Sequence, residues 1–371
     1  MSSALFLVTD IPVPDFSAGK YHAGVDCLLN LMARQGLKLY QSAREGPLAG
    51  PEGLISPDDV VLIKVNAQWK YRGCTNSDVV RGLIQRILEH PEGFNGEVVM
   101  FDNGQGQGSM DGDARGWGRY ADNSIQANAE NPLHSFSYLA QTVFGGRKVS
   151  TYLLDSIREV FIGDTDHQTD GYRIWEGLSY PCFVTMGGNR VELREGLWDG
   201  ARFVDQIKLI NMPVLKTHDG CGVTACLKNF YGVLSMGHPP RDYHYGEAGT
   251  VWGEMIARVR APVLNVLDCI WLSLDHHCGY PASNTSRVNR LLASVDPVAL
   301  DYWASKYIFY PLSGDPNDHP DHPRAYTNSN LDMHLTQARD IINRHGGIRG
   351  QPVTRDEWEM RLFAGRPRER A

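Results

Sequence analysis

Short apolar runs alternate with amphipathic stretches through the first third of the chain. The runs at 4–8, 60–66 and 97–102 are each the length of one buried strand. The segments 23–36 and 77–89 place apolar residues three and four positions apart, which predicts helices. Continuous apolar strands separated by helices are typical of a parallel sheet that is covered on both faces. We therefore predict an α/β fold, with a mostly parallel sheet and helices on both of its faces.

The remainder of the chain contains both strand-like and helix-like patterns of apolar residues. Residues 151–200 alternate polar and apolar side chains between glycine turns, which predicts a hairpin in or beside the sheet. Residues 207–218 predict a buried strand that runs into a polar turn. Asp296 followed by Pro297 marks the start of a helix. Further strands are expected at 263–268 and 290–295, and helices at about 222–232 and 247–260.

These elements divide into two α/β halves. The first half, 1–150, ends in a loop at 104–130 that is rich in Gly, Asp, Asn and Gln. The second half, 151–371, is expected to form an intertwined α/β subdomain with a helical C-terminus. A loop as long as 104–130 is usually functional or mobile in a compact domain.

Composition narrows the classes of function. The chain has 371 residues, is 42% hydrophobic and carries a formal net charge of -7, so it offers no global basic field for nucleic acid or an anionic membrane. No apolar run approaches the roughly 20 residues that span a bilayer, and the first ten residues do not resemble a signal peptide. The seven cysteines are scattered without a Cys-x-x-Cys spacing, which predicts a reducing cytoplasmic setting and no built-in ferredoxin-type cluster. We expect a small anionic molecule as the partner, and the oligomeric state stays open.

One segment concentrates groups that can do chemistry. Lys216 and His218 end the predicted strand at 207–218, and Thr224, Lys228 and Asn229 follow a glycine-rich turn. Backbone N–H groups at a helix start favour an anion, and nearby lysines reinforce that preference. Histidine can transfer a proton near neutral pH. The segment therefore predicts an anion-binding site with acid/base groups.

Polar residues also follow two strands of the first half. Lys64 and Asn66 come at the end of one strand, and Asp102 ends the next. Ligands of parallel α/β sheets bind at the carboxyl ends of the strands. We expect these residues to form a cleft with four residues of the second half, namely Lys216, His218, Lys228 and His244.

Four stretches of the sequence resemble the domain-of-unknown-function family 362. They are residues 60–66, 75–81, 210–232 and 292–301, and the block from Lys216 to Asn229 is the most specific of them. Some members of that family carry a ferredoxin module with clustered cysteines. This chain has no such cluster, so the resemblance implies no iron–sulfur role here.

The spacing of His218, Lys228 and His244 is also similar to that in the lactate racemase family. In those enzymes a lysine tethers a nickel pincer nucleotide, one histidine binds the metal and another moves protons. The resemblance implies that Lys228 anchors a nucleotide-like cofactor, that His244 binds nickel or another divalent metal, and that His218 is the acid/base group. This chain has Thr-Ala-Cys-Leu before Lys228, where that family has Ser-Gly-Gly.

The favoured hypothesis is an enzyme that performs acid/base chemistry, by proton or hydride transfer, on a small anionic substrate such as a hydroxy acid. It would resemble an isomerase or epimerase and be assisted by a metal if one binds. His218 would transfer the proton, and Lys216 or Lys64 would stabilise the developing oxyanion. The residues expected to bind the substrate or cofactor are Lys228, Thr224, Asn229 and Asn66.

Two other classes of protein stay open. One is a metal- or iron–sulfur-associated redox protein, which as a metal-dependent protein would use Asp102, His218 and His244, with Cys221 or Cys226 as a further ligand. The other is a non-catalytic ligand-binding protein with the loop at 104–130 as its contact surface.

Overall fold

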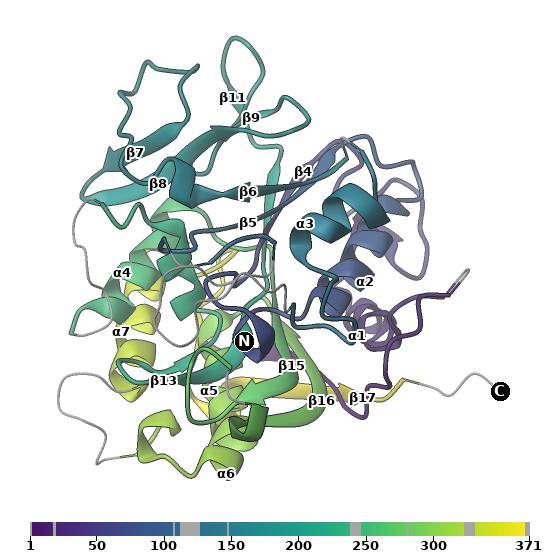
Figure 1. Ribbon diagram of the computed structural model, residues 1–371, viewed down its shortest axis with the longest axis vertical. Coiled ribbons are helices and arrows are strands. Elements are labelled where there is room, and N and C mark those ends of the chain that lie inside the picture. The colour runs from purple at the N-terminus through teal and green to yellow at the C-terminus, as the bar shows by residue number, and fades with distance from the viewer. Residues whose placement is uncertain are drawn as a thin grey trace.

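The computed structural model of the protein describes residues 2–17, 20–106, 108–111, 127–146, 148–237, 246–279, 282–322 and 331–367. Within them the central feature is a ten-stranded sheet (Figure 1). From edge to edge its main path is β17 (Met360–Gly365), β1 (Ser3–Val8), β16 (Thr285–Ser294), β15 (Leu264–Ser273), β12 (Ile207–Asn211), β4 (Val60–Lys64), β5 (Glu97–Asp102) and β6 (Val149–Leu153). A hairpin of β13 (Val214–His218) and β14 (Gly222–Thr224) is attached through β13, which pairs with β15.

The direction of the strands confirms the mostly parallel α/β fold. Strands β15, β12, β4, β5 and β6 are neighbours in this order, and each pair of them is parallel. Only β16 runs antiparallel on the main path, to β15 and to β1, among the described residues. Because β1 lies between β16 and β17, and β4 lies beside β12, the segments 1–150 and 151–371 share one sheet.

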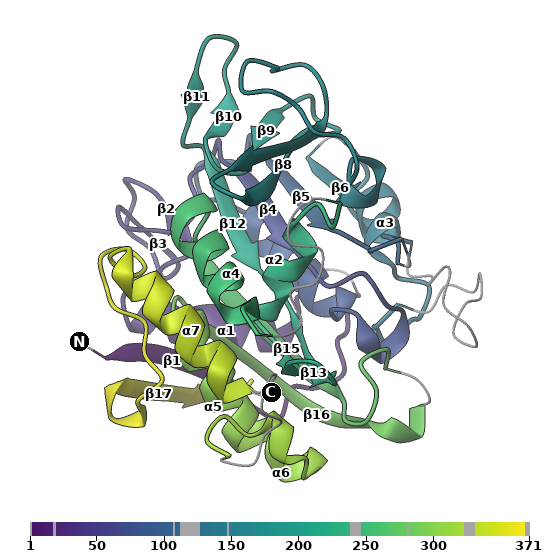
Figure 2. The same cartoon turned by 90° about the vertical axis from the view of Figure 1, so that its left-hand side faces the viewer.

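Helices cover both faces of the sheet (Figures 1 and 2). On one face lie α1 (Ala23–Arg34), α2 (Ser77–Leu88) and the short α3 (Phe136–Tyr138). The other face is covered by α4 (Ala248–Glu254), α5 (Pro297–Ala304) and α7 (Leu331–Arg344). Successive side chains of β4 pack on opposite faces of the sheet. Leu62 belongs to the core beneath α4, α5 and α7, whereas Val61 and Ile63 belong to the core beneath α1 and α2. This explains why the strands read as continuous apolar runs.

A separate five-stranded antiparallel sheet confirms the hairpin predicted at 151–200 and lies above β5 and β6 in Figure 1. Its strands are β7 (Gly171–Trp175), β8 (Leu178–Val184), β9 (Arg190–Glu192), β10 (Gly196–Trp198) and β11 (Phe203–Val204). The remaining strands and helix are β2 (Tyr40–Gln41), β3 (Ala49–Gly50) and α6 (Tyr310–Ser313). No helix among the described residues is both long enough and apolar enough to cross a membrane.

Three sequence predictions of secondary structure were wrong in detail. The predicted helix at 222–232 is instead β14 followed by a 3₁₀ helix, η5 (Lys228–Val233), because residues 222–224 pair with β13. The predicted strand at 207–218 is interrupted after Asn211, since Pro213 cannot donate to a sheet ladder. The C-terminus is not only helical, since β17 follows α7 and pairs with β1.

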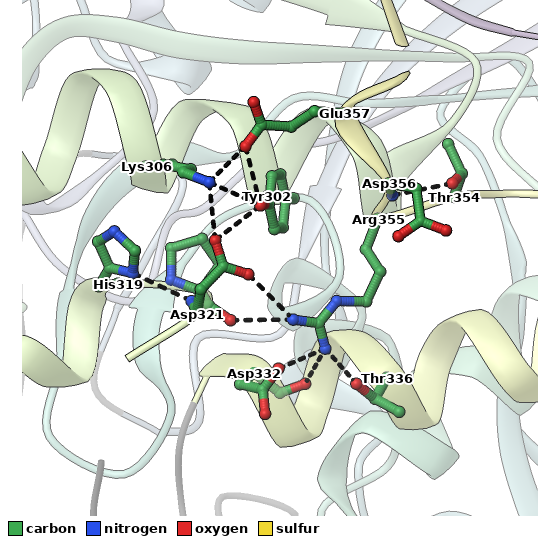
Figure 3. Close-up of polar contacts among 11 residues, drawn as sticks. Tyr302, Lys306, His319, Asp321, Asp332, Thr336, Thr354, Arg355, Asp356 and Glu357 are labelled. Atoms are coloured by element: carbon green, nitrogen blue, oxygen red, sulfur yellow. Dashed lines mark hydrogen bonds and ion pairs between the residues drawn. The ribbon is translucent and has the colours of Figure 1, made fainter. Parts of the chain in front are cut away.

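A polar network fixes α5 against the C-terminal segment (Figure 3). The Lys306 ammonium and the Tyr302 hydroxyl both donate to Asp321, at 2.8 and 2.7 Å. Arg355 forms an ion pair with Asp332 of α7 and donates to the Pro320 carbonyl. These contacts join four separate segments around the end of α5.

Asp296 ties the start of α5 to both chain ends. Its carboxylate accepts hydrogen bonds from the backbone N–H groups of Val298 and Ala299, each at 2.9 Å, and so caps the helix. Its second oxygen accepts from the Ser3 hydroxyl and the Thr354 N–H.

We therefore expect Asp296→Ala to lower the free energy of unfolding by about 2–4 kcal/mol, because a helix cap and two further buried hydrogen bonds are lost. Urea denaturation measures this change. The control Asp340→Ala, at an exposed position of α7, should change stability by less than about 0.5 kcal/mol. Equal effects of the two substitutions would contradict the role of Asp296.

Candidate active site

An ion pair at the carboxyl ends of two neighbouring strands forms the centre of the site. Lys64 ends β4 and Asp102 ends β5, and the Lys64 Nζ lies 2.5 Å from the Asp102 Oδ1. Both side chains are almost fully buried. Burial lowers the pKa of Lys64 and raises that of Asp102, and the attraction between the two charges opposes both shifts.

The backbone around this pair satisfies its remaining hydrogen-bonding capacity. Lys64 Nζ also donates to the Val65 carbonyl and to Asn229 Oδ1, at 2.7 and 3.1 Å. The other oxygen of Asp102 accepts from the Ala67 N–H at 2.6 Å. Gly232 packs so closely that a Cβ there would come within 2.3 Å of Asp102 Oδ1 and 2.7 Å of Lys64 Nζ. A glycine is therefore required at this position.

A row of buried amides extends from Asn229 into the sheet. Asn229 donates to Asn211 at the end of β12, and Asn211 donates to Asn265 of β15, at 2.8 and 2.9 Å. Asn211 lies in register with Lys64 on one side and with Asn265 on the other. The row fixes η5 against the strand ends, so Asn229 holds Lys64 in place.

Lys216 brings a second buried ammonium group to the site from β13. Its Nζ donates to the Gly73 carbonyl at 2.5 Å and lies 3.4 Å from Asn66 Oδ1. Burial, together with the positive charge of Lys228, lowers the pKa of Lys216 to about 7. Lys216 can therefore change its protonation state near neutral pH.

Lys228 is the third buried lysine, and a carboxylate behind the site positions it. Asp301 of α5 accepts from the backbone N–H groups of Cys226 and Leu227, both at 2.8 Å, immediately before Lys228. The Lys228 Nζ lies 5.3 Å from the centre of the Tyr231 ring. Burial raises the pKa of Asp301 to about 7, and its two hydrogen bonds oppose that shift.

Lys64, Asp102, Lys228 and Asn229 line a small polar pocket with a volume of about 20 Å³. This space exceeds only slightly what one water molecule needs, so the pocket holds a single small polar group. Its eleven lining residues are Lys64, Asn66, Gln68, Asp102, Asn103, Gln105, Thr224, Lys228, Asn229, Tyr231 and Gly232.

Two features of the pocket wall are typical of a functional site. The Thr224 hydroxyl is buried and has no hydrogen-bond partner within the described part of the chain. Gln105 has a φ of 55°, a left-handed conformation that is strained for a residue other than glycine. An unsatisfied donor and a strained backbone both cost stability, and a bound ligand would offset the first.

The structure thus brings together six of the nine sequence-predicted site residues around one pocket and places Lys216 beside them. The six are Lys64, Asn66, Asp102, Thr224, Lys228 and Asn229. His218 lies two residues beyond Lys216 on the same face of β13 but does not line the pocket. Its ring lies 5.2 Å from that of His277, and its Nδ1 accepts from the Gly220 N–H. His244 lies outside the described residues.

The nickel pincer nucleotide does not fit the described site. A pocket of about 20 Å³ at Lys228 has no room for a nucleotide. Asp102 is already engaged by Lys64 and Ala67, and the described residues contain no group of three His, Cys, Asp or Glu side chains arranged to hold a metal.

Sequence reasoning missed the residues that hold the site from behind. Asn211, Asn265 and Asp301 touch no pocket space, yet they fix Asn229 and Lys228. Thr75 acts similarly, since its hydroxyl accepts from the Asn66 N–H and donates to the Met212 carbonyl. One feature of the sequence could have identified them, namely a polar residue inside an otherwise apolar run. Such a residue is expected to be buried, and a buried polar group needs a hydrogen-bond partner.

Comparison with known proteins gives one match. Residues 192–306 match the family model described as Domain of unknown function (DUF362), which confirms that resemblance over this segment. The likeness to the lactate racemase family is not shown. No curated protein and no solved structure matched the chain. The matched segment contains Lys216, Thr224, Lys228 and Asp301, while Lys64 and Asp102 lie before it.

The pKa of Lys216 predicts how stability depends on pH. Between about pH 7 and the ordinary lysine value of 10.5, the unfolded chain holds a proton that folded Lys216 has released. Lys216 therefore makes the free energy of unfolding rise with pH in this window. We expect the wild-type value minus the Lys216→Met value to increase by up to about 1.4 kcal/mol per pH unit between pH 7.5 and 9.5. Urea denaturation across that range tests this, and two parallel pH curves would show that the prediction is wrong.

Proposed function

We propose that the protein is an enzyme that performs acid/base chemistry on a small anionic substrate, as isomerases and epimerases of hydroxy acids do. The supporting observation is that Lys64 and Lys228 line one polar pocket and that Lys216, from a third element, lies beside it, 3.4 Å from Asn66 of the pocket wall. Ammonium groups and a buried hydroxyl are donors that bind a carboxylate or another anionic group, so the described lining suits an anionic substrate.

The three lysines would have different roles in this proposal. The Lys228 ammonium and the Thr224 hydroxyl bind the anionic group of the substrate, and this group alone enters the pocket of about 20 Å³. Lys216, with a pKa of about 7, accepts a proton from the substrate carbon as a neutral amine and returns it as an ammonium ion. Lys64, fixed by Asp102, lines the pocket and stabilises the negative charge that develops.

His218 is the second proton carrier in the proposal. It shares a face of β13 with Lys216 and is only partly buried, so it can exchange protons with solvent. In a racemisation or epimerisation, one group removes the proton and another returns a proton on the opposite side of the carbon.

We also propose a cytoplasmic location and a small-molecule partner rather than nucleic acid or a membrane. All seven cysteines are free thiols, which a reducing compartment maintains, and the net charge of -7 disfavours anionic polymers.

A solvent-exchange experiment tests the proposed chemistry. The protein is incubated in D₂O with single enantiomers of 2-hydroxy acids, and deuterium at the carbon next to the carboxylate is followed by proton NMR. We expect exchange with the wild type, and at least about a 100-fold slower exchange with Lys216→Met because the proton-transfer group is lost. The control Lys20→Met changes an exposed lysine that pairs with Asp15, and it should leave the rate unchanged. Saturable binding of the acids without exchange would instead indicate a ligand-binding protein.

A second substitution tests the part assigned to His218. We expect His218→Gln to abolish turnover of an exchanging substrate, with a melting temperature within about 2 °C of the wild type because the side chain is only partly buried. Differential scanning calorimetry and the exchange assay measure the two quantities. A variant that fails to fold would show that His218 is structural, and unchanged turnover would remove it from the mechanism.

A further inference from the structure

A strained arginine forms the tip of a tight turn far from the candidate active site. Ile348 and Gln351 exchange backbone hydrogen bonds of 2.8 and 3.0 Å around the two central residues Arg349 and Gly350. Both central residues have positive φ, 52° and 71°, as in a type I′ turn. Asn, Asp or Gly normally occupies the first central position, because other side chains are strained there. Such strain is often retained where the side chain has a function.

Arg349 lines a cavity of about 410 Å³ at the amino ends of the central strands. Ile207 and Lys208, which begin β12, form part of its wall, and so does Val263, which precedes β15. Lys64 and Asn211 lie at the opposite ends of β4 and β12, so this cavity is separate from the candidate active site. Its size is within the range of small-molecule sites.

The described lining of this cavity has an excess of positive charge. It contains four basic and two acidic residues, which are Arg194, Lys208, Arg260, Arg349, Glu195 and Asp205. Each acidic residue is already paired, Asp205 with Arg260 at 2.6 Å and Glu195 with Arg194. Lys208 lies 3.9 Å from Asp59, so Arg349 is the one basic group of the lining that forms no ion pair within the described residues.

Two guanidinium groups of the cavity retain hydrogen-bonding capacity. Arg349 is exposed at the tip of the turn, and within the described residues no carboxylate forms an ion pair with it. The Nε of Arg194 is buried without a hydrogen-bond partner in the same part of the chain. The cavity therefore has one buried donor without an acceptor, and the exposed Arg349 guanidinium is open to a ligand.

We propose that this cavity binds a small molecule with a diphosphate group, through Arg349 together with Lys208 and Arg194. Guanidinium groups bind phosphate oxygens in a bidentate manner, and a diphosphate presents enough acceptors for several basic groups at once. The apolar residues Val259 and Ile348 of the cavity wall offer a surface for an organic substituent. The ligand is therefore either free pyrophosphate or a nucleoside diphosphate.

Replacement of Arg349 by asparagine separates strain from binding. Asparagine tolerates positive φ, so we expect Arg349→Asn without ligand to melt about 2 °C or more above the wild type. The same variant should bind pyrophosphate at least about 10-fold more weakly, because a charge-assisted contact is lost. Scanning fluorimetry and isothermal titration calorimetry on the full chain, at constant ionic strength, measure both effects.

The chain contains a matched control for this experiment. Glu176 and Gly177 join β7 to β8 in a turn with the same pair of positive φ values, 47° and 84°. Glu176→Asn should leave the pyrophosphate affinity unchanged, since Glu176 does not line the cavity. Its melting temperature should rise less than that of Arg349→Asn, because this substitution also removes the ion pair with Arg258. Tighter binding of ADP than of pyrophosphate would identify a nucleoside diphosphate, and equal binding would identify the inorganic ion.

The outcomes also separate this site from the proposed active site. The proposal is overturned if the wild type does not bind either probe at millimolar concentration, or if Arg349→Asn binds both as the wild type does. Loss of binding in Lys216→Met but not in Arg349→Asn would place the diphosphate in the active-site pocket instead. Failure of the exchange assay would leave the diphosphate proposal unaffected, because the two sites share no residue.

Discussion

The buried ion pair between Lys64 and Asp102 is the interaction on which the candidate site depends. Removing one partner of such a pair leaves an uncompensated buried charge, which typically costs about 3–5 kcal/mol. The pair is tolerated because every part of it is hydrogen-bonded, by Val65, Ala67 and Asn229. The same bonds fix the segment after β4 and the helix η5 against the strand ends. The need to hydrogen-bond this buried ion pair therefore determines the shape of the pocket.

The rigidity of the pocket is supplied by residues that do not line it. The amide row through Asn211 joins three neighbouring parallel strands, and Asp301 fixes the backbone before Lys228. The helix that carries Asp301 is held at its start by Asp296 and at its end by the network around Tyr302 and Lys306 (Figure 3). Functional groups are positioned accurately when their supports are themselves packed and hydrogen-bonded.

The sequence was sufficient to predict the fold class and the end of the sheet where the site lies. Apolar runs identified β1, β4 and β5, and the rule for the carboxyl ends of strands placed Lys64 and Asp102 together. Both inferences rest on local periodicity and on sheet geometry, which a single sequence contains. The Asp296 cap of α5 was also predictable, because it depends only on adjacent residues.

The remaining features depend on contacts between distant segments. Residues 222–224 form a strand because β13 is available to pair with them, and no local pattern shows this. The contact of Gly232 with the ion pair joins positions far apart in the chain, and so does the amide row. The position of His218 could be predicted only in part. The alternation of side chains along β13 shows which face of the strand His218 lies on, but not that its side chain stays outside the pocket.

The two basic cavities illustrate how local charge differs from net charge. The chain as a whole is negative, yet each cavity has more basic than acidic residues in its described lining. They lie at opposite ends of β12, a strand of five residues that spans roughly 16 Å. This separation exceeds the Debye length of about 8 Å at physiological salt, although protein between the sites screens less than water does. Direct electrostatic coupling between bound anions would therefore be weak, and any stronger coupling would require β12 itself to move. Because β12 is hydrogen-bonded on both sides and buried within the sheet, it provides a stiff link, and the two sites should bind their ligands independently.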